Sequence, residues 1–181
     1  GPAEAMMAAE FVGAPLVMEE HASNAVAAAV EMQMRMEEIN QWNEVHGFPQ
    51  LEMGIGINTG EVIVGNIGSE RRSKYGVMGS HVNLCGRIES YTVGGQVLIS
   101  PMTRSMIKEP LSVMQEMEVM PKGVKSPLIL SHVTGIGGEY QLSYEQKEEE
   151  LVVLEQPQEV TFSLVKDKHN DMKENSGCIT A

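Results

Sequence analysis

Two side chains, Asn83 and Arg87, have the residue types and the spacing to do chemistry. They lie in the stretch YGVMGSHVNLCGRIES (residues 75–90), where a helix is predicted from Ser80, its N-cap, to Tyr91. Residues four apart share one face of a helix, about 40° from each other. That face then presents an amide beside a guanidinium, which suits phosphoryl oxygens because it stays charged and binds them in a fork.

A simpler interpretation of the same helix has no chemistry in it. Leu84, Ile88 and Tyr91 form a separate apolar stripe that is suited to packing on a sheet. Arg87 could then lie at the surface and pair with Glu89 or another acid. On spacing alone, this surface ion pair is the preferred interpretation.

A longer helix is predicted before this region, over residues 21–46. Small and apolar residues recur there at helical spacing, and we expect this stripe, methionines included, to pack in the core: Ala25, Ala29, Met32, Met36 and Ile39. Gly47 and Pro49 supply the stop signal.

Two strands separated by the turn NTG are predicted next, over residues 51–57 and 61–67. In the first, apolar residues alternate with Glu52, Gly54 and Gly56, which predicts one buried face, and the two strands are expected to pair as a hairpin. The glycines lie inside and at the end of a strand, so they do not form a dinucleotide-binding fingerprint. A polar connection with a short extended piece near Tyr75 leads to the helix of Asn83.

The remaining pattern predicts an α+β fold. A strand at 96–100, a short helix that begins at Pro101, and strands at 111–120 and 126–136 joined by the turn PKGVK complete a mostly antiparallel sheet with helices packed on it. We predict a domain over residues 1–138. Residues 139–181 are expected to be a charged connector and the start of a second module of unknown type, with a strand at 158–165.

Composition excludes several classes of protein. The net charge of -12 argues against binding a nucleic acid polymer through a general basic surface. No run of 18 apolar residues is present, so we expect no membrane contact by this segment and a cytoplasmic location. The start of the chain lacks the features of a signal peptide. The two cysteines, Cys85 and Cys178, have neither zinc-ligand spacing nor a disulfide framework, and Cys85 is expected in the core.

The wider string around Asn83 resembles the class III nucleotide cyclases, the adenylate and guanylate cyclase family. The matching motifs are G-I-N-T-G, V-x-V-G-N-I-G, Y-x-x-x-G-x-x-V-N and R-x-E, all within residues 54–90, and the resemblance covers roughly residues 5–135. It implies the ferredoxin-like cyclase fold, here expected to miss its first strand.

The resemblance also implies an activity. Such domains convert a purine nucleoside triphosphate to a 3′,5′-cyclic nucleotide and pyrophosphate, at a site shared by a head-to-tail homodimer or by two partner chains. Asn83 would orient the ribose, Arg87 would stabilise charge on the α-phosphoryl group, and Lys122 would meet the terminal phosphates, with Lys125 a close competitor. Two divalent ions, Mg or Mn, would be held by two aspartates.

Two departures from the family pattern stand out. The segment GPAEAMMAAEFVGAP has Glu4 near the place of one metal-binding aspartate, and no aspartate, so no metal ligand is assigned and the isolated chain is expected to be inactive. Gly76 occupies the position that helps to choose the base, and it has no side chain to do so. ATP, and hence cAMP as product, is preferred only because adenylate cyclases are commoner.

Two other functions stay open at this point. One is a non-catalytic cyclase-homology domain that dimerises and regulates, which the missing aspartates favour. The other is a ferredoxin-like interaction module with an accidental motif match. Asn83, Arg87 and Lys122 favour the enzyme, because the fold alone needs none of them.

Overall fold

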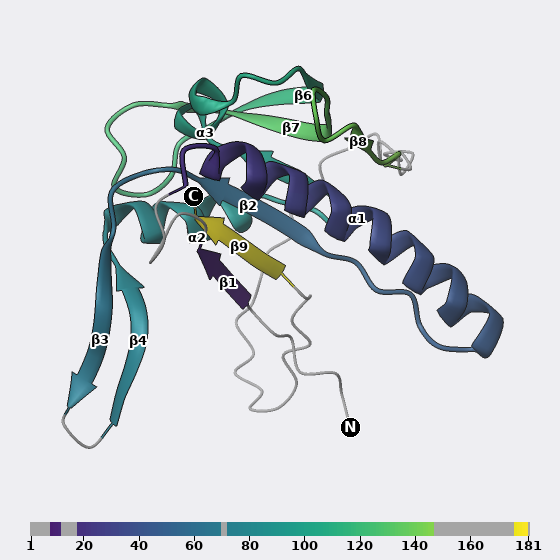
Figure 1. The fold of residues 1–181 in the computed structure, drawn as a ribbon, viewed down its shortest axis with the longest axis horizontal. Coiled ribbons are helices and arrows are strands. Elements are labelled where there is room, and N and C mark those ends of the chain that lie inside the picture. Colours follow the sequence, from purple (N-terminus) through teal and green to yellow (C-terminus); the bar gives the residue numbers. More distant parts are fainter. Residues whose placement is uncertain (1–7, 12–17, 70–71, 147–175, 181) are drawn as a thin grey trace, which may run out of the picture.

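The main sheet carries one long helix on one face and a shorter helix on the other (Figure 1). This computed structural model describes residues 8–11, 18–69, 72–146 and 176–180. The sheet has the order β1-β9-β2-β5-β7-β6, and a short strand β8 pairs with the end of β7. Its strands are β1 (Ala8–Phe11), β2 (Gly54–Asn58), β5 (Val97–Ile99), β6 (Leu111–Val119), β7 (Leu128–Ile136), β8 (Leu142–Ser143) and β9 (Ser176–Thr180).

The described strands confirm the predicted α+β class. Antiparallel pairing joins β5 to β7, β6 to β7 and β7 to β8, whereas β1 pairs with β9, β9 with β2 and β2 with β5 in parallel. The strands β6 and β7 flank the predicted PKGVK turn, and the short helix α3 (Pro101–Met106) begins at Pro101 with Ser100 as its N-cap.

The helix α1 (His21–His46) has the predicted bounds and ends at Gly47, whose φ of 72° is the left-handed C-cap conformation. The predicted methionine stripe is wrong in its second half, because Met32 and Ile39 are 38% and 45% exposed. The core face lies in the first half, at Ala22, Ala25, Val26, Ala29, Val30 and Gln33.

The second half of α1 packs on a loop instead of on the sheet. Asn40 donates to the Leu51 carbonyl at 2.7 Å and accepts from the Leu51 amide, and Asn43 donates to the Pro49 carbonyl at 3.1 Å. Polar residues therefore hold this end of the helix, which runs beyond the strands (Figure 1). The apolar periodicity could not distinguish a sheet contact from a loop contact.

The strand β2 is buried on both faces, which corrects the predicted single buried face. All five of its residues are buried. Ile55 and Ile57 contact the cluster under α1, whereas Gly54 and Gly56 approach the segment from Glu89 to Thr92 on the other face. The predicted hairpin of residues 51–67 is also wrong, because β2 pairs with β5 and β9 and makes no ladder with the strand that follows the NTG turn.

A projecting hairpin contains the strand predicted at 61–67 and the extended piece predicted near Tyr75. The strands β3 (Ile63–Ser69) and β4 (Arg72–Met78) pair antiparallel as a separate two-stranded sheet and extend away from the main sheet (Figure 1). Ile63 is 70% exposed and Met78 is 49% exposed. The predicted strand at 61–67 is thus present, but its predicted partner is wrong, because it pairs with β4 and not with residues 51–57.

The C-terminal region is described only in part. The predicted strand at 158–165 lies outside the described residues, and the predicted boundary at residue 138 stays a prediction. The strand β9 pairs in parallel with β1 on one side and with β2 on the other. No helix among the described residues is long and apolar enough to cross a membrane.

Candidate active site

The helix α2 (Ser80–Glu89) follows β4 directly and carries the predicted pair. The predicted N-cap, Ser80, is wrong. The N-cap is Gly79, and no side chain caps the helix. Gly79 has a φ of 151°, a conformation that favours glycine, and its carbonyl accepts a hydrogen bond from the Asn83 amide at 3.3 Å. A glycine turn thus sets where the helix begins.

The two sides of α2 differ as its sequence predicts. Ile88 is fully buried and contacts Leu98 and Leu130 on the face of the sheet opposite α1. Asn83 and Arg87 are both exposed. The helix therefore docks through its apolar side and presents the amide and the guanidinium to solvent, where a ligand or a second protein can reach them.

Arg87 lies against the turn that carries Lys122. Its Nη1 contacts the backbone carbonyl oxygen of Lys122, although the two residues are 35 positions apart. Gly123, next in the turn, has a φ of 85°, which favours glycine. The structure thus brings Arg87 and the PKGVK turn together, with the side chains of Lys122 and Lys125 exposed.

The surface ion pair between Arg87 and Glu89 does not form. Glu89 is 8% exposed, and the ion pairs among the described residues involve Arg35 and Arg104. Arg87 is left with a neutral carbonyl as its hydrogen-bond partner. A guanidinium in this state keeps most of its donors available for an anionic group.

Gly76 stands apart from these residues. It lies on β4, where its Cα partner on β3 is Gly65. The hydrogen bonds of the described residues join Arg87 to Lys122, but they join neither of them to Gly76.

Sequence reasoning treated the NTG segment as a turn only and missed what it contacts. Asn58 is 1% exposed, and its Nδ2 donates to the His81 carbonyl in the first turn of α2 at 2.9 Å. Thr59 lies 3.0 Å, Oγ1 to Oγ1, from Thr103 of α3. The available signal was a polar residue directly after a buried strand, since buried amides need partners.

Cys85 corrects a second expectation. Its side chain is fully buried, as expected for a core residue, but it is disulfide-bonded. The count of two cysteines did not predict this bond.

The residues present do not fit a two-metal site. The sequence has no aspartate between residues 6 and 142. Within the part of the chain that the structure describes, no group of three or more histidine, cysteine or acidic residues could hold a metal ion. Glu4 lies outside that part. Hard divalent cations require several oxygen ligands, so no catalytic step of this chain is derived through a metal.

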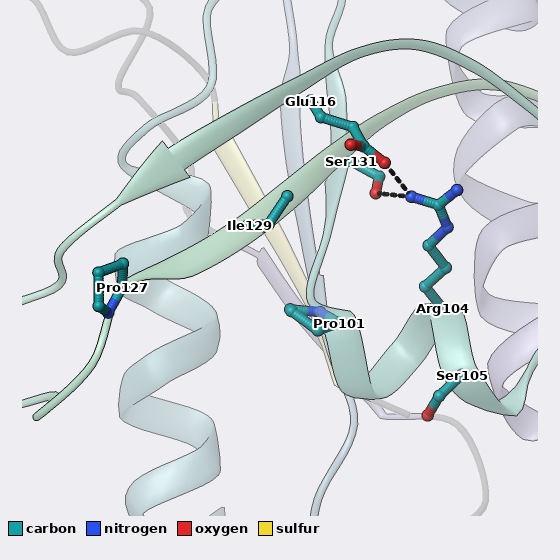
Figure 2. Close-up of a pocket in the computed structure, with 7 residues that line it drawn as sticks. All are labelled: Pro101, Arg104, Ser105, Glu116, Pro127, Ile129 and Ser131. Atoms are coloured by element: carbon teal, nitrogen blue, oxygen red, sulfur yellow. Dashed lines mark hydrogen bonds and ion pairs between the residues drawn. The ribbon is translucent and has the colours of Figure 1, made fainter.

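A shallow pocket lies elsewhere, between α3 and the hairpin of β6 and β7 (Figure 2). Its cation, Arg104, is already bound by the Glu116 carboxylate and by Ser131 Oγ, the latter at 2.9 Å. None of the predicted site residues lines it. This pocket is therefore separate from the candidate site on α2.

Comparison with known proteins identifies the family. The model of the adenylate and guanylate cyclase catalytic domain matches residues 6–142. The chain belongs to this family. The matched residues of this cyclase domain include α2, the PKGVK turn and the β3–β4 hairpin.

The relatives of this cyclase domain include proteins named as adenylate cyclases and proteins named as guanylate cyclases. The chain is 29% identical over 125 residues to adenylate cyclase 1 of Rhizobium meliloti, which covers 68% of the chain and 19% of the relative. It is 30% identical over 112 residues to guanylate cyclase soluble subunit beta-2 of Rattus norvegicus, which covers 61% of the chain and 16% of the relative. The chain thus spans less than a fifth of these proteins.

Solved cyclase structures share the fold. The guanylyl cyclase Cya2 is 50% identical with a TM-score of 0.68, over 73% of this chain and 67% of that one. The adenylyl cyclase CyaB from P. aeruginosa is 27% identical with a TM-score of 0.60, over 68% and 65%. The expected cyclase fold is confirmed.

Proposed function

We propose that this chain is a nucleotide cyclase domain that supplies the Asn83 and Arg87 half of a site shared between two protomers. The product is a 3′,5′-cyclic nucleotide, and pyrophosphate leaves. The observation that carries the proposal is the state of Arg87, which is exposed on α2, forms no ion pair among the described residues and donates to the backbone carbonyl of Lys122.

Each residue has a distinct part in this proposal. Asn83 orients the ribose so that its 3′ oxygen lies in line with the α-phosphorus. As the new oxygen–phosphorus bond forms and the bond to pyrophosphate breaks, Arg87 stabilises the charge that develops on the α-phosphoryl oxygens. Lys122 holds the terminal phosphates, and its turn already lies against Arg87. Phosphoryl transfer depends mainly on such positioning and charge stabilisation.

The other half of the site comes from the partner protomer. The matched region of this chain has no aspartate, so the acidic ligands for Mg or Mn would be the partner's. A head-to-tail arrangement of two cyclase domains places such a half-site opposite the exposed side of α2. A heterodimer with a cyclase domain that carries those acids satisfies this arrangement, and a homodimer does so only if both protomers carry them outside residues 6–142.

The substrate is a purine nucleoside triphosphate. No residue of this chain favours ATP over GTP, because Gly76 offers no side chain to read the base. The 50% identical structure is that of a guanylyl cyclase, and a 26% identical guanylate cyclase domain, from Catenaria anguillulae, was solved in complex with GTP. We therefore propose GTP as the first substrate to test, with ATP beside it.

A second function, a non-catalytic cyclase-homology domain that dimerises and regulates, is favoured by the absence of aspartate between residues 6 and 142. It keeps the fold and the dimer contact but makes no product. A regulatory domain does not need an exposed guanidinium on α2, and this difference separates the two functions.

Complementation tests the proposal. The chain is mixed with a cyclase domain that keeps its acidic metal ligands but has lost its own Asn and Arg, and cyclic nucleotide is measured with GTP or ATP and Mn. The expected result is turnover by the mixture and none by either chain alone. A heterodimer that is demonstrated by light scattering but makes no product would support the regulatory function instead.

A further inference from the structure

The helix α2 and the residues that follow it approach three glycines of the segment Gly54–Gly60 closely. A methyl group on Gly56 would lie 2.5 Å from the Glu89 amide nitrogen and 2.7 Å from the Glu89 Cα, closer than real Cβ atoms approach. A methyl group on Gly60 would overlap the His81 ring. Glycine in a strand often marks such a close approach.

These two contacts lie at opposite ends of the helix. His81 is in the first turn of α2, and Glu89 is its last residue. A rigid helix held at both ends has a fixed height above the strand and a fixed tilt. Gly56 therefore lets the backbone at the end of the helix approach the strand, and Gly60 leaves room for the His81 ring in its first turn.

Asn58 resists sliding and rotation of α2 along the strand. Its amide is 1% exposed and donates to the His81 carbonyl at 2.9 Å. A buried donor that loses its acceptor is costly, so the pairing resists a shift of the helix. Because the acceptor is backbone, the bond fixes the helix itself and not a side-chain rotamer.

The anchored residues bracket the exposed pair. Asn83 follows His81 by two positions and Arg87 precedes Glu89 by two. The apolar contacts of Ile88 with Leu98 and Leu130 already hold α2 on the sheet. Glycine inside a strand makes that strand less stable. We therefore attribute the glycines at these positions to the close approach of α2, which a larger residue would prevent.

We propose that Gly56, Asn58 and Gly60 are positioning residues that hold Asn83 and Arg87 at the height and register needed for the cyclase reaction. This inference rests on the proposed function. Misplacement of a reacting group by about 1 Å can cost roughly 10²-fold in rate. A methyl group at Gly56 or loss of the Asn58 donor displaces α2 and both of its exposed side chains together.

The test measures kcat and KM of the complemented heterodimer. Gly56→Ala and Asn58→Asp, which keeps the size but removes the donor, should each lower kcat roughly 10- to 100-fold with KM within about twofold. Gly86→Ala is the matched control on the same helix, because its methyl group meets nothing within 4 Å, and it should keep kcat within about twofold. Folded Gly56→Ala and Asn58→Asp proteins with the wild-type kcat would overturn the proposal.

A rescue experiment guards against variants that simply fail to fold. Gly60→Ala should lower kcat, and adding His81→Ala should restore it to the level of His81→Ala alone, because truncation removes the ring that the new methyl group meets. Absence of rescue in a folded double variant contradicts the proposal.

A crystal structure separates failure of this inference from failure of the proposed function. If the wild-type chain gives no turnover with a partner, the proposed function fails, and the position of α2 still tests the positioning. The expected result is that α2 has moved off the strand in Gly56→Ala and has not moved in Gly86→Ala. An unmoved α2 in Gly56→Ala overturns it.

Discussion

The Arg87 guanidinium contacts the backbone carbonyl of Lys122, and this contact joins α2 to the turn between β6 and β7. The acceptor is main chain, so the Lys122 side chain stays exposed and separate from it. Arg87 and the Lys122 ammonium can therefore meet different parts of one triphosphate, with the arginine at the reacting phosphorus and the lysine at the terminal phosphates.

Lys122→Ala should raise KM of the complemented cyclase roughly tenfold and leave kcat within about threefold. The reason is that the side chain binds the terminal phosphates in the substrate and in the transition state alike, whereas the carbonyl contact to Arg87 survives the substitution. Lys125→Ala, in the same turn, is the matched control and should keep KM. Equal KM increases in both variants would contradict the assignment of Lys122.

The isolated chain should make no measurable cyclic nucleotide from GTP or ATP with Mn. Residues 6–142 contain no aspartate, and the described residues offer no cluster that could hold two ions. Product formation is measured by chromatography over several hours at high chain concentration. Steady turnover by the purified chain would show that its metal ligands are residues other than those that we considered.

The double-sided burial of β2 predicts a large loss of stability for Ile57→Ala. Ile57 is fully buried in the cluster beneath α1, and removal of a buried isoleucine side chain costs about 2–5 kcal/mol in the free energy of unfolding. Val45→Ala, at 82% exposure near the end of α1, should cost less than about 0.5 kcal/mol. Urea unfolding of both variants measures the difference, and similar losses would contradict the assignment of the core.

The stability of the fold should decline below pH 6.5 through His132. Burial lowers the pKa of this histidine from 6.5, and its side chain is 2% exposed, with Nε2 3.4 Å from the Tyr144 hydroxyl. Below pH 6.5 the unfolded chain binds a proton that the folded chain does not, so acid favours unfolding. Above that pH the contribution is complete.

His132→Gln removes this titration and should flatten the decline in unfolding free energy between about pH 6.5 and pH 5. His46→Gln, at an exposed position, is the control and should keep the wild-type decline. The measurement is urea unfolding at several pH values. An unchanged slope in His132→Gln assigns the pH dependence to other groups.

The sequence predicted the ends of those helices that residues next to them in the chain determine. The bounds of α1 followed from its period and from Gly47, and the start of α3 followed from Pro101. The exposed placement of Asn83 and Arg87 followed from helical geometry, because Ile88 and its apolar neighbours face the other way.

Tertiary relationships were beyond the sequence. The strand β2 is covered on both faces, so its alternation of glycine with isoleucine is not an alternation of exposed with buried residues. The strand at 61–67 was predicted, but the sequence did not indicate that it pairs with β4 instead of with β2. The approach of Arg87 to Lys122 joins residues 35 positions apart and depends on the whole sheet.

The most direct measurement of the central claim is kcat of the complemented heterodimer with Arg87→Ala in this chain. Charge develops on the α-phosphoryl oxygens only as the 3′ oxygen attacks, so loss of the guanidinium should lower kcat by roughly 10²–10³-fold, about 3–4 kcal/mol, with KM little changed. Arg87→Lys should restore only part of the rate, since a point charge does not reproduce the fork. The melting temperature should stay near that of the wild type, because Arg87 is exposed and forms no ion pair among the described residues. Full kcat in Arg87→Ala would contradict the account and remove this residue from the reaction.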